Sequence, residues 1–164
     1  MSGWKTLLFH RTTVRAAQIV IGAIMAIAAL AKLGDQGAFA AQIHNFRILP
    51  LAAENLVAIT LPWIELIAAL ALVLGVRARS GGILTSAMLA VFTVAVISAV
   101  ARGLNFQCGC FGTADGTRVG YVKILENFAM LAIALLASVR PVGSRVREAS
   151  GEVTAGRAMR ADLS

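Results

Sequence analysis

Four long apolar stretches divide the chain, and short polar segments separate them. They run from Val14 to Leu33, from Asn55 to Val76, from Ser80 to Ala101 and from Tyr121 to Val139. A helix needs about 20 mostly apolar residues to cross the hydrocarbon core of a bilayer. The pattern therefore predicts an all-α integral membrane protein that folds as a four-helix transmembrane bundle.

The fourth stretch gives the weakest signal. The third has no charged residue between Arg79 and Arg102, whereas Lys123 and Glu126 fall in the first turns of the fourth. Taken alone, the fourth stretch could be an interfacial helix. We expect it to span, because Tyr121 suits the headgroup level, Lys123 can snorkel, and Glu126 lies near the positive end of its own helix dipole.

The connection between the first two spans, residues 34–54, is too long for a simple turn. Apolar side chains recur there at helical spacing (Phe39, Ile43 and Phe46), and Pro50 ends the run. We expect a short amphipathic helix along the membrane interface. Its polar side would carry Gln42, Asn45 and Arg47. A well-packed connector is the alternative, and the sequence does not separate the two.

Composition supports the membrane assignment. Hydrophobic residues make up 59% of the chain and charged residues 14%, and the mean hydropathy is +0.81, outside the usual range for a soluble domain. The chain has room for one membrane domain, residues 14–139. Residues 1–13 and 140–164 are expected to be cytoplasmic tails, the second of them disordered because it has too little apolar surface to fold.

The distribution of basic residues predicts the orientation. With four spans, both termini lie on one face, and that face collects ten of the fifteen lysines and arginines: Lys5, Arg11, Arg15, Arg77, Arg79, Arg140, Arg145, Arg147, Arg157 and Arg160. The positive-inside rule places this face in the cytoplasm. The net charge of +7 is then mostly a topology signal. Nucleic-acid binding is not expected, since aromatic residues are only 6% of the chain.

The two cysteines of the sequence, Cys108 and Cys110, form a Cys-Gly-Cys-Phe-Gly motif between the third and fourth spans. The predicted orientation places this motif in the periplasm of a bacterium, where disulfides form and persist. A disulfide across one residue would remove little loop entropy, so as a staple it would be nearly useless. Strained, exposed disulfides belong to the labile and catalytic kind, and we expect a redox-active dithiol.

The residues around the cysteines fit that chemistry. Gly109 and Gly112 allow the backbone to bend sharply and to be approached by another chain. Arg102, Arg118 and Lys123 could stabilise a thiolate. A soft-metal ligand pair and cysteines without any thiol chemistry remain alternatives. A metal site is disfavoured by the number of ligands. The two sulfurs would need His44 or a methionine as further ligands, whereas tetrahedral zinc takes four donors.

A carboxylate stands midway through the second span, in Leu61-Pro62-Trp63-Ile64-Glu65. Within a membrane it needs a partner or a proton, and Lys32 is the candidate partner. Lys32 stands about 10 Å nearer the outer face, a gap that a lysine pointing back along its helix can largely close. A structural pair that locks the first two helices is favoured, and a role in proton uptake or quinone contact is the alternative. Glu126 and Asn127 are expected to form interhelical hydrogen bonds.

Five sequence blocks together resemble the MauE family of DoxX-like membrane proteins. They are Gly22…Ala31-Lys32-Leu33, Asn45-Phe46-Arg47-Ile48-Leu49-Pro50, Leu61-Pro62-Trp63-Ile64-Glu65-Leu66, Cys108-Gly109-Cys110-Phe111-Gly112 and Glu126-Asn127. The resemblance covers residues 14–139. It implies an inner-membrane protein for maturation of the disulfide-rich small subunit of methylamine dehydrogenase, acting with a MauD-like, thioredoxin-like periplasmic partner. By the resemblance, Cys108 and Cys110 are the redox pair, while Lys32, Pro50, Pro62, Glu65 and Asn127 match family positions of unassigned role.

Counting cysteines constrains the mechanism. The predicted cytoplasmic face has none, so a complete transmembrane dithiol relay is disfavoured. Two schemes survive: disulfide exchange with a periplasmic partner alone, or coupling of the dithiol to a membrane quinone. Cys108 is the weakly preferred attacking sulfur, with Cys110 resolving. The direction of electron flow, the client and the oligomeric state stay open, as does whether the chain is itself an oxidoreductase component.

Four rival functional classes compare with the redox assignment as follows. A membrane scaffold with incidental cysteines is the main alternative, and a metal-binding protein is the second. An acid–base enzyme has little support, because Glu65 has no histidine or second carboxylate beside it in the second span. A transporter also lacks support, since the sequence shows no internal repeat.

Overall fold

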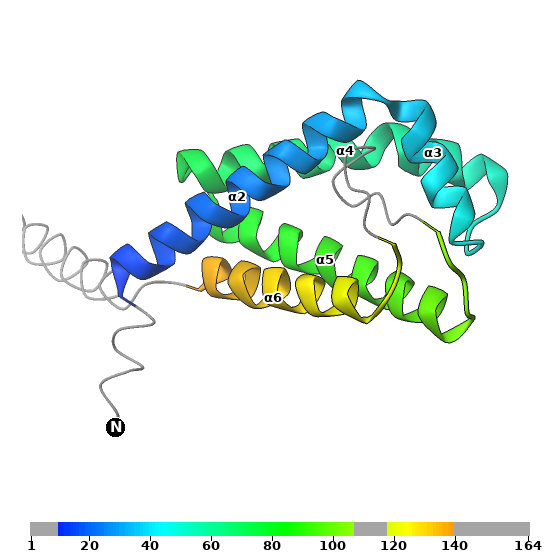
Figure 1. Ribbon diagram of the computed structural model, residues 1–164. Coiled ribbons are helices and arrows are strands. Elements are labelled where there is room, and N and C mark those ends of the chain that lie inside the picture. Colours follow the sequence, from blue (N-terminus) through cyan, green and yellow to red (C-terminus); the bar gives the residue numbers. More distant parts are fainter. Residues whose placement is uncertain (1–9, 107–117, 140–164) are drawn as a thin grey trace, which may run out of the picture.

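The computed structural model describes residues 10–106 and 118–139 of the chain. Within these ranges four long helices form a bundle, and one short helix lies between the first two (Figure 1). The long helices are α2 (Arg11–Gly34), α4 (Leu51–Leu74), α5 (Ala78–Ala101) and α6 (Tyr121–Ser138), and the short one is α3 (Gln36–Asn45). All four long helices have the length and hydropathy to cross a membrane, which confirms the predicted all-α bundle.

The helix ends differ from the predicted spans where backbone geometry, and not hydropathy, sets the boundary. α2 begins at Arg11 instead of Val14, because charged residues can join a helix that extends beyond the apolar core. α4 begins at Leu51 instead of Asn55, directly after Pro50. It ends before Gly75, whose φ of 78° is the left-handed conformation that commonly terminates helices.

The long helices form a closed ring of antiparallel neighbours. α2 packs on α4, α4 on α5, α5 on α6, and α6 returns to α2. We call the end of the bundle that holds the start of α2 and the end of α6 the tail end. The opposite end, where α2 turns into α3, is called the α3 end (Figure 1).

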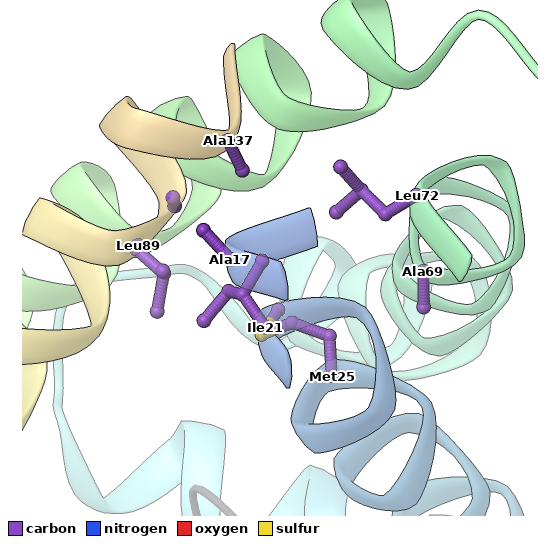
Figure 2. Close-up of a cluster of buried hydrophobic side chains, with 8 residues drawn as sticks. Ala17, Ile21, Met25, Ala69, Leu72, Leu89 and Ala137 are labelled. Carbon is purple, nitrogen blue, oxygen red and sulfur yellow. The ribbon is translucent and has the colours of Figure 1, made fainter. Parts of the chain in front are cut away.

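Small side chains let the helices approach closely. Figure 2 shows side chains from all four long helices converging on one core cluster, in which alanines alternate with larger residues: Ala17, Ile21, Met25, Ala69, Leu72, Leu89, Ala134 and Ala137. Between apolar helices in lipid, association depends on such close packing and not on hydrophobic burial. Gly82 is the tightest example, since a Cβ there would stand 2.9 Å from the backbone N and Cα of Ser138.

Two polar side chains fix α2 against its neighbours at the tail end. Arg15 donates from Nη1 to the carbonyl of Leu72 at 2.9 Å and from Nη2 to that of Val73 at 2.6 Å. Gln18 donates to the carbonyl of Ala137 at 3.0 Å. These carbonyls belong to the last turns of α4 and α6, where a helix has no partners of its own for them. The contacts therefore set the register of α2 on both neighbours.

The expected short helix before Pro50 is present as α3, and its polar side differs from the prediction. Asp35 caps it by accepting from the backbone N–H of Ala38 at 2.9 Å. Gln42 was expected on the polar side, but its Oε1 is buried. Arg47 was expected there too, but it follows the helix with a left-handed φ of 51°. The helix packs on α4 and on the end of α2.

We predict that Gly82→Ala destabilises the bundle by about 1–3 kcal/mol, because the new methyl group would overlap the backbone of α6. Reversible unfolding in mixed micelles, followed by circular dichroism, measures this change. Gly34→Ala is the matched control, since nothing lies within 4 Å of a Cβ there. Equal stability of the two variants would contradict the close α5–α6 contact.

Candidate functional site

The predicted redox residues Cys108, Gly109, Cys110, Phe111 and Gly112 lie outside the described residues. The residues on either side of segment 107–117 are described. The backbone N–H of Val119 donates to the carbonyl of Phe106 at 2.9 Å. The two ends of the cysteine-bearing segment are therefore joined at one place, at the α3 end of the bundle.

An aromatic cluster supports this place. The Phe46 ring lies edge-on to Phe106, with centroids 4.8 Å apart, and edge-on to Phe92 at 5.9 Å. Such pairs contribute about 0.5–1.5 kcal/mol beyond their buried area. Val96 and Ala99 of α5 complete the buried part of the cluster. Phe46 thereby connects the segment after α3 to α5 and to the start of the cysteine-bearing segment.

Arg102 lies beside the same cluster, as its sequence position suggests, and its guanidinium has specific partners. Nη2 donates to the carbonyl of Phe46, and Nη1 donates to the carbonyl of Arg47 at 3.3 Å. Nε donates to Ser98 in the last turn of α5. Arg102 therefore holds the turn after α3 against α5. Its proposed support of a thiolate stays a prediction.

Lys32 and Glu65 form a buried ion pair between α2 and α4. Nζ of Lys32 lies 2.7 Å from Oε2 and 2.9 Å from Oε1 of Glu65. The same ammonium lies 5.5 Å from the centroid of the Phe39 ring on α3. The pairing suggested by the sequence is present, because the lysine points back along α2 and closes the difference in depth.

Lys123, Glu126 and Asn127 lie near the start of α6, and each departs from its prediction. Glu126 was expected to bond to another helix, but it accepts from Lys123 within α6. Lys123 was expected to snorkel outward, but its side chain is 1% exposed and donates to Glu126 at 2.8 Å. Asn127 was expected to bond to another helix, but it is 0% exposed and neither Oδ1 nor Nδ2 has a hydrogen-bond partner among the described residues. Leaving such a buried group unpaired costs about 1–3 kcal/mol.

A histidine–carboxylate pair at the α3 end was missed from the sequence. Nδ1 of His44, on α3, lies 3.0 Å from Oε2 of Glu54 in the first turn of α4. The Glu54 side chain is buried, whereas that of His44 is largely exposed. The signal that could have found it is a carboxylate just after Pro50, at the positive end of the next helix.

The hydrogen bond between Gln18 and Ala137 locates the polar groups along the bundle. α2 and α6 are antiparallel. Counting toward the α3 end, Ala28 is as many residues from Gln18 on α2 as Asn127 is from Ala137 on α6, so the two residues lie at a similar level along the bundle. At about 1.5 Å per residue, that level is about 15 Å from the bond. On α2, the residue at the level of Asn127 is therefore Ala28, whose side chain is small and apolar.

A second contact gives the same level on α5. Gly82 on α5 adjoins Ser138 on α6. Counting toward the α3 end, Thr93 is as many residues from Gly82 as Asn127 is from Ser138, so Thr93 and Asn127 lie at a similar level. The Thr93 hydroxyl donates to the carbonyl of Leu89 at 2.6 Å, within its own helix. It therefore has no proton to donate to the amide oxygen of Asn127.

Lys32 and Lys123 each lie one helical turn nearer the α3 end than this level. Together with Glu65 they make the interior charged in the half of the bundle next to α3, while the tail half holds the apolar core cluster. Among the described residues, no group of three or more histidines, cysteines, aspartates or glutamates comes together as a metal site.

We predict that Lys32→Met and Glu65→Gln each destabilise the protein by about 3–5 kcal/mol, because each leaves one buried charge without its partner. The double variant Lys32→Met/Glu65→Leu should recover most of this loss, since well-packed apolar residues often replace a buried pair at little cost. Unfolding in mixed micelles gives the three free energies. Single variants that lose less than about 1 kcal/mol would contradict a structural lock, and a stable double variant that is inactive in maturation would indicate a functional role.

Comparison with known proteins agrees with this architecture. The sequence profile of the family described as methylamine utilisation protein MauE matches residues 10–140. The chain is 34% identical over 121 residues to methylamine utilization protein MauE of Paracoccus denitrificans, a match that covers 73% of this chain and 65% of that protein. It is 32% identical over 153 residues to the protein of the same name from Methylorubrum extorquens, covering 90% and 81%.

The chain thus spans slightly less than two thirds of the Paracoccus denitrificans relative. No solved structure matches it significantly. The match to the family extends over all five described helices, from the start of α2 to the end of α6. The protein is a multi-pass membrane protein of the MauE family.

Proposed function

We propose that this protein is a membrane thiol–disulfide redox accessory in methylamine utilisation, with Cys108 and Cys110 as its dithiol. The name shared by its relatives supports the metabolic context. The observation that carries the redox assignment is the position of the cysteines. Both cysteines of the sequence lie in segment 107–117, whose ends are bonded together at the α3 end through Phe106 and Val119.

The orientation follows from the charges at the two ends. By sequence position, ten of the fifteen lysines and arginines belong to the tail end, among them Arg11, Arg15, Arg77 and Arg79. Five lie toward the α3 end: Lys32, Arg47, Arg102, Arg118 and Lys123. By the positive-inside rule the tail end would lie in the cytoplasm of a bacterium, with both termini. Segment 107–117 would then face the periplasm, where disulfide chemistry takes place.

The reaction would be thiol–disulfide exchange with a thioredoxin-like periplasmic partner. A thiolate of the dithiol attacks the disulfide of the partner, so a mixed disulfide forms and one partner thiolate leaves. The second cysteine then attacks the mixed disulfide and releases the partner as a dithiol, while Cys108–Cys110 is oxidised. The reverse sequence is equally balanced, and the reduction potentials of the two pairs set the direction. The client would be a disulfide-rich subunit of methylamine dehydrogenase.

A non-catalytic scaffold would use the same end of the bundle differently. Phe46, Arg102 and the His44–Glu54 pair build a fixed surface there that does not depend on the cysteines. Cys108→Ser/Cys110→Ser separates the two functions. Loss of methylamine dehydrogenase maturation with normal protein levels supports the redox role, and full maturation supports the scaffold.

Labelling with a membrane-impermeant maleimide on intact spheroplasts tests the dithiol and its orientation. We expect a mass shift on the protein only after mild reduction, because the resting state would hold a reversible disulfide open to the periplasm. Labelling without reduction would indicate resting thiols or a metal site. Absence of labelling in both states, with labelling in detergent, would contradict the periplasmic placement.

Two single-cysteine variants in the Cys108→Ser/Cys110→Ser background control for orientation. Asn105→Cys places a thiol at an exposed position of the α3 end, and Ser80→Cys places one at an exposed position near the tail end. The first should react with the impermeant reagent and the second should not. The opposite pattern would place the cysteine segment in the cytoplasm.

A further inference from the structure

The buried amide of Asn127 has no use in the fold. It is fully buried on α6, and neither its donor nor its acceptor atom has a partner among the described residues. Gln42 repeats the feature on α3, where its Oε1 is buried and unpartnered. In folded proteins such groups are nearly always hydrogen-bonded. Thr85 on α5 also has a buried, unpartnered hydroxyl, but Asn127 is the one described residue with both a donor and an acceptor buried and unpaired. This amide points to a partner outside the protein.

The polar neighbours of Asn127 are engaged elsewhere. At its level, Ala28 on α2 offers no side-chain hydrogen bond, and the hydroxyl of Thr93 on α5 donates within its own helix. Lys32 begins one turn nearer the α3 end, but its side chain points back along α2, and its ammonium is bonded to both oxygens of Glu65. A rotation of the Lys32 or Thr93 side chain toward the amide would break these existing bonds, so the amide is left without a partner among the described residues.

The depth of Asn127 limits what can reach it. It lies about 9 Å along α6 from Tyr121, at about 1.5 Å per residue, and so below the headgroup level in a spanning helix. Water-soluble ions are poor candidates at that depth. A membrane-soluble molecule with an apolar body and an uncharged polar head fits better.

We propose that the half of the bundle next to α3 binds the head group of a membrane quinone, with the Asn127 amide as its principal hydrogen-bonding group. The Nδ2 of the amide can donate to the carbonyl of a quinone, and its Oδ1 can accept from the hydroxyl of a hydroquinone. One side chain therefore serves both redox states without rearrangement.

Electron transfer from the dithiol to the bound quinone rests on the proposed function, whereas quinone binding itself does not. A cysteine dithiol that becomes a disulfide releases two electrons and two protons, and a quinone that takes up both becomes a hydroquinone. The reaction is balanced without another reactant. It also fits a sequence with no cysteines other than Cys108 and Cys110, which leaves no second thiol pair to carry the electrons across the membrane.

Calorimetric titration of the full-length protein in nanodiscs with decylubiquinone tests the site, with empty nanodiscs subtracted. We expect saturable binding that Asn127→Leu weakens about tenfold or more, as expected for loss of a buried hydrogen bond. Because the amide has no protein partner, this near-isosteric variant should unfold at the same temperature as the wild type or higher. Asn55→Leu, at an exposed position of α4, is the matched control and should leave Kd within about twofold.

Photo-crosslinking to the wild type makes the test independent of any variant. An azido-quinone should label the α6 peptide that contains Asn127, and excess decylubiquinone should abolish the labelling. Cys108→Ser/Cys110→Ser should bind the quinone as the wild type does, so a failure of the redox proposal would leave this binding intact. Uptake equal to that of empty nanodiscs, labelling elsewhere only, or unchanged binding by Asn127→Leu would overturn the inference.

Discussion

The bilayer offers no water to polar groups, and this constraint governs how the bundle is assembled. Arg15 and Gln18 bond to carbonyls in the last turns of α4 and α6, and Lys32 is paired with Glu65 on both oxygens. Each of these contacts joins α2 to another helix. α2 carries several polar side chains, and these are paired only when α4 and α6 are in one particular register relative to α2.

The two halves of the bundle meet this constraint differently. The tail half is closed by backbone contacts at small residues, such as Gly82 against Ser138, and Arg15 and Gln18 donate to carbonyls at helix ends. Thr85 is also buried in that half, and its hydroxyl has no partner among the described residues. The half next to α3 contains an ion pair, a buried lysine and the unpaired amide of Asn127. The close backbone contacts thus lie in the tail half, and the buried charged groups and the unpaired amide lie in the half next to α3. The cysteine-bearing segment begins and ends beside the half next to α3.

Helix α3 connects these features. Phe39 lies over the Lys32 ammonium, Phe46 packs on Phe92 and Phe106, and Arg102 bonds to the turn that follows the helix. Substitutions in α3 can therefore affect both the ion pair and the ends of segment 107–117. The position of α3 gives the MauE-type bundle a fixed surface at the end where we propose that a partner protein docks.

Hydropathy and local motifs were enough to predict the four spans, the short helix before Pro50 and the family, because both depend on neighbouring residues along the chain. The sequence also suggested the Lys32–Glu65 pair, since an ionised group midway through a span needs a counter-charge. The tertiary structure decided the rest: the buried side chain of Lys123, the His44–Glu54 pair and the unpartnered Asn127. These depend on helix register and rotation, which arise from close contacts between distant residues such as Gly82 and Ser138, and no local pattern encodes them.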